Sequence, residues 1–406
     1  MAYGDGMPLR IWVAFTVLLA MAVSMVSPGA QAAPPHGSNA AVDSYFMYVA
    51  TYTDGTSKSK GIYRYRFDAK TGKLTANGLA AEIVNPGWLT TDPQHRFLYA
   101  VTERPNHNGS DAYKKEGSIS SYAIDAKTGA LTFLNKVSSQ GGGPCFVRVD
   151  KGSKTLFAAN YGTGSVVSFA IKPDGSIGER LSFDQHTGSS VDKARQEGPH
   201  AHATVLSSDN RFLFVPDLGT DQVRIYKVDT ANGTFAPNDP AYVTVRPGLG
   251  PRHFAFGKDG RFAYVLCEMG SSVAVFSFDA AKGSLTPVQT VYNLPPDFKG
   301  VDNSAEIEVD RSGRFLYASN RGHDSITVYA IDPSKGTLTV VQNISTQGSI
   351  PRNFALDPTG KYLVVGNQKS DEIRVFAVNQ KDGTLKPIEE TVALDEPICI
   401  LFVPAA

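Results

Sequence analysis

Cysteine is scarce in this chain: only three occur among 406 residues, at Cys145, Cys267 and Cys399. The number is odd, and no Cys-x-x-Cys or Cys-x-x-Cys-His sequence is present. These observations argue against a disulfide framework, a cysteine-based zinc site and covalently attached haem. We therefore expect three buried, apolar thiols without a redox role.

The chain also lacks net charge, since 39 lysines and arginines balance 39 aspartates and glutamates. Without a basic surplus, neither nucleic acid nor an anionic membrane surface is an expected partner. Charged residues make up only 19% of the chain, whereas glycine occurs 38 times. This composition is typical of compact, turn-rich β structure rather than of disorder.

Long apolar runs are missing except near the N-terminus, where Arg10 precedes the apolar segment 11–26. A Ser-Pro-Gly break and the small-x-small sequence Ala-Gln-Ala follow, ending just before Ala33. The pattern predicts a signal peptide over residues 1–32, a flexible tail over 33–42, and export to a periplasm or the medium. An uncleaved membrane anchor is the alternative, although the run is short for a span of ~20 residues.

One pattern recurs along the rest of the chain. A start residue, often proline, precedes an apolar strand, a turn, a basic residue followed by Phe-Leu-Tyr-like sequence, and a second hairpin ending in Lys-x-Gly-x-Leu. The copies start at Pro86, Pro144, Ala201, Pro251, Ser304, Pro351 and Pro397. Successive starts are 46 to 58 residues apart. Repeats of this length, with four strands of period two, are typical of β-propeller blades.

The seventh copy is divided between the two ends of the chain. After Pro397 only one strand remains, and the missing strands occur at 45–52 and 61–68. We therefore predict an all-β fold: a seven-bladed β-propeller with four-stranded blades. Pairing of the C-terminal strand with the N-terminal hairpin would close it, and residues 43–406 would form a single domain.

The start of strand one and the end of strand two of each blade should meet at one mouth of the central channel. Polar residues accumulate at these positions, mostly in the third to sixth copies, where the repeat otherwise prefers apolar ones. Costly polar groups that break a consensus indicate a functional site. The candidates are Glu103, His200, His202, Arg252, His253, Glu268, Glu306, Arg321 and Arg352.

His200 and His202 are two residues apart, so their side chains should share one strand face. One of them could act as a catalytic or substrate-binding group, or both could be structural. A metal is not expected, because the arginines at the mouth would repel it. We therefore predict no metal and no cofactor.

The arginines at Arg252, Arg321 and Arg352 suit a carboxylate or phosphate, which guanidinium groups bind in a bidentate manner. They could instead pair with Glu103, Glu268 and Glu306 across the channel, and both interpretations can hold together. Glu268 could be a general base or a structural partner of Arg252. His323 and the asparagines or aspartate before the strand-two ends (Asn160, Asp217, Asn320 and Asn367) are expected to support turns.

With these residues in view, the chain resembles the lactonase family of seven-bladed propellers, which includes propeller-type 6-phosphogluconolactonases and carboxymuconate cycloisomerases. The resemblance covers about residues 45–404. It rests on Gly-Pro-His-Ala-His (198–202), Pro-Asp-Leu-Gly (216–219), Gly-Pro-Arg-His (250–253), Ser-Ala-Glu-Ile (304–307), Asn-Arg-Gly-His-Asp-Ser (320–325) and Pro-Arg-Asn-Phe (351–354).

The resemblance implies a hydrolase of a sugar or acid lactone without a metal. The predicted signal peptide adds export, which departs from the cytosolic route of 6-phosphogluconolactone, so another sugar or acid lactone is an open alternative as the substrate of an exported member. The proposed site of the cycloisomerase branch implies His200 or His202, Arg252, Glu268 and Arg321 as its counterparts here. The expected partner is a small anionic lactone; the oligomeric state is left open. Two alternatives stand: a non-enzymatic binding propeller, because fold alone does not imply catalysis, and a cycloisomerase that uses the same residues.

Overall fold

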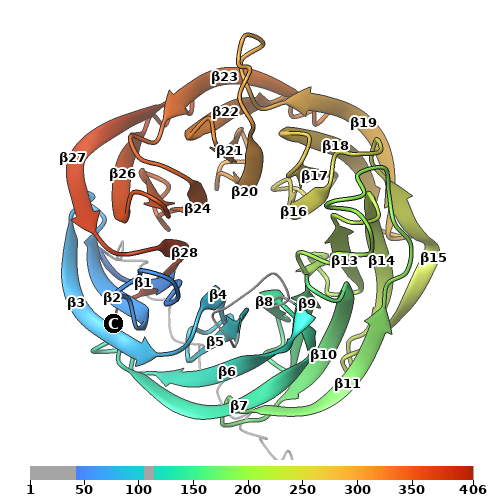
Figure 1. Cartoon of the computed structure of the whole chain (residues 1–406), viewed down its shortest axis with the longest axis horizontal. Helices are drawn as coiled ribbons and strands as arrows, with labels where there is room; N and C mark the ends of the chain where they lie inside the picture. The colour runs from blue at the N-terminus through green and yellow to red at the C-terminus, as the bar shows by residue number, and fades with distance from the viewer. Residues whose placement is uncertain (1–42, 105–113, 406) are drawn as a thin grey trace, which may run out of the picture. The chain divides into compact units, whose positions relative to one another are not determined.

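The computed structural model describes residues 43–104 and 114–405. The expected signal peptide and tail, residues 1–42, lie outside the described residues. Within them, strands form seven four-stranded antiparallel sheets arranged as blades around a central channel (Figure 1). No helix in these two ranges is long and apolar enough to cross a membrane. The predicted all-β, seven-bladed propeller is confirmed.

The strands of the first three blades, from the channel outward, are as follows. The closing blade contains β28 (Pro397–Pro404), β1 (Ser44–Thr51), β2 (Gly61–Asp68) and β3 (Leu74–Glu82). The next contains β4 (Pro86–Thr91), β5 (Phe97–Thr102), β6 (Glu116–Ile124) and β7 (Leu131–Gly142). The third contains β8 (Pro144–Val149), β9 (Thr155–Asn160), β10 (Ser165–Ile171) and β11 (Ile177–Gln185).

The remaining four blades follow the same order. They contain β12 (Val205–Leu206), β13 (Phe212–Asp217), β14 (Gln222–Asp229) and β15 (Thr234–Thr244); β16 (Pro251–Phe256), β17 (Phe262–Cys267), β18 (Ser272–Asp279) and β19 (Ser284–Tyr292). The last two contain β20 (Asn303–Val309), β21 (Phe315–Arg321), β22 (Ser325–Ile331) and β23 (Leu338–Ser345); β24 (Pro351–Leu356), β25 (Tyr362–Asn367), β26 (Glu372–Val378) and β27 (Leu385–Ala393).

Pairing of the two ends of the chain closes the propeller as expected. β28 lies antiparallel to β1, with Tyr45 opposite Pro404 and Ala50 opposite Cys399. The blade therefore has its inner strand from the C-terminus and its other three strands from the N-terminus. Closure gives this blade a neighbouring blade on each side, as every other blade has.

The apolar core lies between neighbouring blades. β1, β9 and β13 are buried along nearly their whole length, because both faces of these strands pack against another blade. For example, Phe214 of β13 stacks on Phe254 of β16 in the next blade, with ring centroids 5.1 Å apart. Outer strands such as β3 are largely exposed. This explains why second strands such as β13 carry apolar residues on both faces.

The aspartate in the repeat holds the turn between the first and second strands. Oδ1 of Asp92 accepts hydrogen bonds from the backbone N–H groups of Arg96 and Phe97, at 2.7 and 3.0 Å. Asp150 and Asp310 do the same in their own blades. An Asx-type turn of this kind sets where the second strand begins, and thus fixes which residue ends it at the channel mouth.

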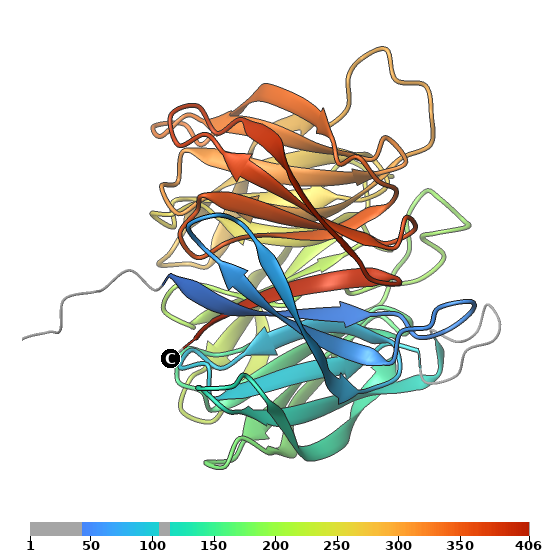
Figure 2. The same cartoon turned by 90° about the vertical axis from the view of Figure 1, so that its left-hand side faces the viewer.

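The repeat starts coincide with strand starts in all but two blades. Pro86, Pro144, Pro251, Pro351 and Pro397 begin their strands, and Ser304 is the second residue of β20. The larger departure is at Ala201, which forms only an isolated bridge with Asp217, while the strand itself is limited to Val205–Leu206. A long connection from β11 enters this blade, and Figure 2 shows it projecting in green from one face of the propeller, together with the orange loop before β20.

Candidate functional site

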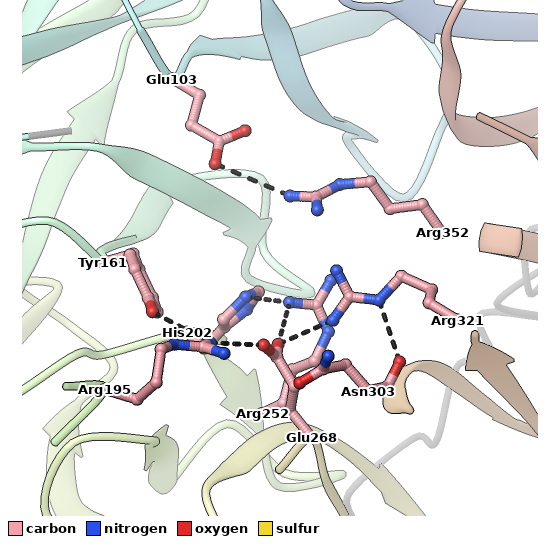
Figure 3. Close-up of a pocket in the computed structure, with 9 residues that line it drawn as sticks. All are labelled: Glu103, Tyr161, Arg195, His202, Arg252, Glu268, Asn303, Arg321 and Arg352. Atoms are coloured by element: carbon pink, nitrogen blue, oxygen red, sulfur yellow. Dashed lines mark hydrogen bonds and ion pairs between the residues drawn. The ribbon is translucent and has the colours of Figure 1, made fainter. Parts of the chain in front are cut away.

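A cavity of about 280 Å³ opens at one mouth of the channel (Figure 3). Its lining comes from strand starts, strand ends and one loop, so segments far apart in the chain build it together. The residues around it are Glu103, Tyr161, Arg195, His202, Arg252, Glu268, Asn303, Arg321 and Arg352. Six of the nine predicted site residues are therefore brought together here. We call this space the catalytic cavity.

Glu268, directly after β17, lies at the centre of three guanidinium groups. Its Oε1 accepts from Arg195 at 2.6 Å, and its Oε2 contacts Arg321 at 3.0 Å and Arg252 at 3.2 Å (Figure 3). Burial alone would raise the pKa of Glu268, but the three cations outweigh burial and hold that pKa well below its ordinary 4.5. The carboxylate is thus ionised throughout the physiological range and is a weak base.

His202 contacts Arg252, one of the three arginines that pair with Glu268. Its Nε2 is bonded to a terminal nitrogen of Arg252, and its Nδ1 lies 3.7 Å from the Sγ atom of Cys145. Burial lowers the pKa of His202 well below 6.5, and the Arg252 charge lowers it further. The imidazole is therefore neutral at pH 7, and its Nε2 accepts a hydrogen bond from Arg252 at the wall of the cavity.

The guanidinium groups retain donors for a ligand. Arg252 donates through Nε to the Ala305 carbonyl at 2.7 Å, and its Nη1 serves His202 and Glu268. Among the described residues, Nη2 of Arg252 has no hydrogen-bond partner. Arg321 likewise uses Nε and Nη2 on Asn303, Ser304 and Glu268, at 3.0 to 3.3 Å. Each side chain thus keeps one terminal nitrogen for a bound oxygen.

The opposite wall of the cavity carries Glu103 and Arg352. These two groups are 3.7 Å apart, a long ion pair, and Glu103 also accepts a 2.5 Å hydrogen bond from the hydroxyl of Tyr52. The guanidinium of Arg352 lies 5.4 Å from the centre of the Tyr52 ring. The Arg352–Glu103 ion pair is therefore longer than the three ion pairs around Glu268.

Three residues that line the catalytic cavity were not among the candidates from the sequence: Arg195, Tyr161 and Asn303. Arg195 comes from the connection between β11 and β12, and it also contacts the Tyr161 hydroxyl at 3.4 Å. The neighbouring Gln196 anchors this connection by donating to the Leu218 carbonyl at 2.9 Å. The sequence did contain one signal for Arg195: the stretch between the second hairpin of the copy that starts at Pro144 and the next start, Ala201, is unusually long. Extra chain next to a channel mouth can supply a side chain to it.

Three predicted site residues lie elsewhere. His200 stacks on Tyr161 at 4.6 Å and bonds to the Tyr161 carbonyl through Nδ1, so it lies behind the cavity wall. His253 and Glu306 line a second, deeper cavity of about 200 Å³. His253 and Glu306 lie at this other depth because the strand register shifts at the start of β16 and of β20. Such a shift places neighbouring residues at different depths along the channel.

The structural roles expected for other polar residues are confirmed. Asn160 and Asn367 donate to the backbone carbonyls of Ser139 and Thr346, at 3.1 and 3.2 Å. Asp217 accepts from the N–H groups of His200 and Gly219, at 2.8 and 3.0 Å. All three cysteines are free and buried, as expected. Within the described ranges, no group of three or more histidine, cysteine, aspartate or glutamate side chains is arranged to hold a metal.

Comparison with known proteins gives relatives along almost the whole domain. Residues 46–402 match the family model described as "Lactonase, 7-bladed beta-propeller". A 6-phosphogluconolactonase of Bacillus subtilis (strain 168) is 33% identical over 359 residues, which is 88% of this chain and 98% of that protein. A 6-phosphogluconolactonase of Formosa agariphila is 32% identical over 314 residues, 77% of this chain and 86% of that protein.

Solved structures agree with this assignment. A periplasmic gluconolactonase of Pseudomonas aeruginosa superposes with a TM-score of 0.83 at 35% identity, covering 89% of this chain and 100% of that one. The family match, these relatives and the seven-bladed architecture all cover the part of the chain that carries the cavity. This chain belongs to the lactonase family of seven-bladed β-propellers.

Proposed function

We propose that the catalytic cavity hydrolyses a sugar-acid lactone that carries a negative charge. The observation that carries this proposal is the charge of the cavity wall. Four guanidinium groups face two carboxylates, so two positive charges remain even when both carboxylates are ionised. Such a wall favours an anionic substrate. Relatives named 6-phosphogluconolactonase and gluconolactonase support a sugar lactone as its class.

In the proposed mechanism, a bound water molecule replaces Arg252 as the donor to Nε2 of neutral His202. That nitrogen accepts the water proton as the water oxygen attacks the lactone carbonyl carbon. The carbonyl oxygen becomes an oxyanion, and the free terminal nitrogens of Arg252 and Arg321 donate to it. Collapse of this intermediate breaks the ring C–O bond, and the leaving oxygen takes the proton back from His202. The product is a hydroxy acid. Glu268 acts as a positioning residue that fixes the orientation of the arginines.

The open volume beside Glu268 favours this proposal over a non-enzymatic propeller. Arg252 and Arg321 pair with Glu268, yet a space of about 280 Å³ remains next to them. That space is close to the lower end of ordinary ligand pockets, roughly 300 Å³, which suits a monosaccharide-sized molecule.

Replacing Arg352 tests the charge of the substrate. In Arg352→Gln we expect KM to rise about tenfold or more for 6-phosphogluconolactone, because a hydrogen bond to a charged group contributes roughly 1.5–3 kcal/mol. KM for uncharged gluconolactone should stay within about twofold, as it lacks the charged arm. Steady-state acid release at controlled pH, corrected for spontaneous hydrolysis, gives both values.

Arg104→Gln is the matched control for that experiment. Arg104 also lies over the Tyr52 ring, at 4.2 Å, but it does not line the catalytic cavity. It should leave both KM values nearly unchanged. Equal effects of Arg352→Gln on the charged and the uncharged lactone would refute the proposed role of the cavity charge.

We also propose that the protein is exported. The apolar segment 11–26 and the small-x-small sequence before Ala33 support this, as does the similar structure described as periplasmic. N-terminal sequencing of the protein isolated from producing cells tests the proposal. We expect Ala33 as the first residue; an N-terminus that retains the apolar segment would contradict cleavage.

A further inference from the structure

Arg195 differs from the other two arginines that pair with Glu268. Arg252 lies in β16 and Arg321 ends β21, and only 4% and 13% of their side chains are exposed. Arg195 instead comes from the connection between β11 and β12, and 37% of its side chain is exposed. Since Arg195 also lines the catalytic cavity, it is the guanidinium group of this cluster that a bound molecule can reach most easily.

A single carboxylate fastens the connection near both of its ends. Oδ2 of Asp217 lies 2.5 Å from Nδ1 of His186, the first residue after β11. Oδ1 of the same side chain accepts a hydrogen bond from the backbone N–H of His200, at 2.8 Å. Asp217 and His186 are buried, so their contact is shielded from water. The connection thus has fixed end points, although residues 186–200 contain no strand.

Asp192 and Gln196 fix the turn that carries Arg195. Oδ1 of Asp192 accepts from the backbone N–H groups of Ala194 and Arg195, at 2.8 and 3.2 Å. The buried Gln196 side chain donates to the Leu218 carbonyl at 2.9 Å and accepts from the backbone N–H of Asp192 at 3.1 Å. The backbone beneath Arg195 is therefore in place before any substrate binds, which lowers the entropic cost of using this side chain.

Arg195 keeps two nitrogen donors for a ligand. Its Nη2 donates to Oε1 of Glu268 at 2.6 Å and also contacts the Tyr161 hydroxyl at 3.4 Å (Figure 3). Within residues 43–104 and 114–405, its Nε and Nη1 have no hydrogen-bond partner. The ion pair with Glu268 orients the guanidinium plane and compensates its charge. The two remaining donors therefore suit a neutral substrate oxygen, such as that of a hydroxyl group.

The position of Arg195 indicates which substrate oxygen it meets. Arg195 binds Oε1 of Glu268. Oε2 of the same carboxylate binds Arg252 and Arg321, which hold the lactone carbonyl oxygen in the proposed mechanism. A hydroxyl on carbon 2 of a lactone lies about one hydrogen-bond length from that carbonyl oxygen. It is thus the substrate hydroxyl nearest to Arg195, whereas the ring oxygen must face His202 to receive its proton.

We propose that Arg195 determines specificity by binding the hydroxyl group on carbon 2 of the lactone, which makes the catalytic cavity selective for 2-hydroxy lactones. Nε or Nη1 of Arg195 donates to the hydroxyl oxygen. Gln196 and Asp217 act as positioning residues, because they hold the connection that carries Arg195. This inference rests on the proposed function and assigns one further substrate contact in that same site.

Removing the hydroxyl from the substrate tests the contact without changing the protein. Gluconolactone and its 2-deoxy analogue are compared, both as free lactones and as their 6-phosphates, with acid release corrected for spontaneous hydrolysis. The spontaneous rates also correct for the different intrinsic reactivity of the two lactones. After this correction we expect kcat/KM to be about tenfold or more lower for the 2-deoxy lactone, because a hydrogen bond from a charged donor is lost.

Arg195→Gln should remove this preference. We expect kcat/KM for the 2-hydroxylated lactone to fall about tenfold or more, because the charged donor is gone. For the 2-deoxy lactone the loss should be less than about threefold, since Arg252 and Arg321 still hold Oε2 of Glu268. A role of Arg195 confined to supporting Glu268 would instead lower both values by the same factor.

Two further variants complete the experiment. Lys193→Gln is the matched control, because it removes one positive charge from an exposed side chain of the same connection that does not line the cavity. It should leave both kcat/KM values within about twofold, since exposed charges contribute little. Gln196→Leu retains Arg195 but removes the anchor at Leu218, so it should reduce the preference by less than Arg195→Gln does. Thermal unfolding of all three variants identifies any loss that comes from instability.

Equal corrected kcat/KM values for the two lactones in the unsubstituted protein would overturn the inference, as would equal losses in Arg195→Gln. Both results leave the proposed function standing, since hydrolysis itself is then observed. Absence of hydrolysis of all four lactones would overturn the proposed function and this inference with it. A preference that is lost in Arg195→Gln and kept in Lys193→Gln supports the inference.

Discussion

His202→Gln should reduce kcat/KM for lactone hydrolysis by about 10²–10⁴-fold, the usual range for loss of a general base. Glutamine retains an oxygen that can accept the hydrogen bond from Arg252, so the arginine geometry is preserved. It cannot accept and return a proton. The effect should therefore appear mainly in kcat, with a smaller change in KM.

His200→Gln is the matched control, because it alters the other histidine of the same motif. His200 bonds to the Tyr161 carbonyl and does not line the catalytic cavity. We expect less than about a tenfold loss, through slight displacement of the Tyr161 ring. A larger loss in His200→Gln than in His202→Gln would reverse the assignment.

The pH profile gives an independent check on His202. Its pKa is lowered by burial and by Arg252, so the basic form dominates above that lowered value. We expect kcat/KM to rise with pH below 6.5 and to level off by neutral pH. The rise should be absent from the residual activity of His202→Gln.

Glu268→Gln should lower the free energy of unfolding by about 3–5 kcal/mol at pH 7, the range for removing one partner of a buried ion pair. Arg252 and Arg321 are nearly buried and would lose the carboxylate that compensates both. Arg195 is more exposed, so its lost contact contributes less. Urea unfolding of both proteins measures the difference.

The difference should shrink as the solution is acidified. The folded-state pKa of Glu268 lies below the ordinary 4.5, so its stabilisation is complete above 4.5. It is lost as pH falls below that value and through the folded-state pKa, because protonated Glu268 resembles glutamine. Glu103→Gln, which breaks a single 3.7 Å ion pair, should cost less. Equal stability of Glu268→Gln and the unsubstituted protein at pH 7 would contradict the role of Glu268 in holding the arginines in position.

The fold could be predicted because each blade repeats local signals. Asp92 and its equivalents hold the first turn, and prolines such as Pro86, Pro144 and Pro251 begin inner strands. The blade starting at Ala201 departs from this pattern, since its inner strand is reduced to two residues. Repeats predict the scaffold well, but they say little about the segment where a copy deviates from the others.

The site could be predicted only in part, for two physical reasons. Arg252 follows a repeat start, whereas Glu268 and Arg321 lie at the ends of second strands. Both kinds of position face the same channel mouth, so the convergence of these residues follows from the alignment of blades. Arg195 comes from a connection with no equivalent in other blades, and its position depends on tertiary contacts such as that of Gln196 with Leu218. The register shift at β16 places His253 at another level from Arg252, and the spacing of residues in sequence does not reveal such a bulge.

The most direct test of the account is hydrolysis of a lactone panel by the full chain, with His202→Gln measured beside it. The panel contains 6-phosphogluconolactone, gluconolactone and carboxylated lactones, and acid release is corrected for spontaneous hydrolysis. We predict turnover above background for at least one charged lactone, at a higher kcat/KM than for gluconolactone, and its loss in His202→Gln. No turnover above background for any lactone, or equal turnover in His202→Gln, would contradict the claim that this arginine-lined cavity is a lactonase active site.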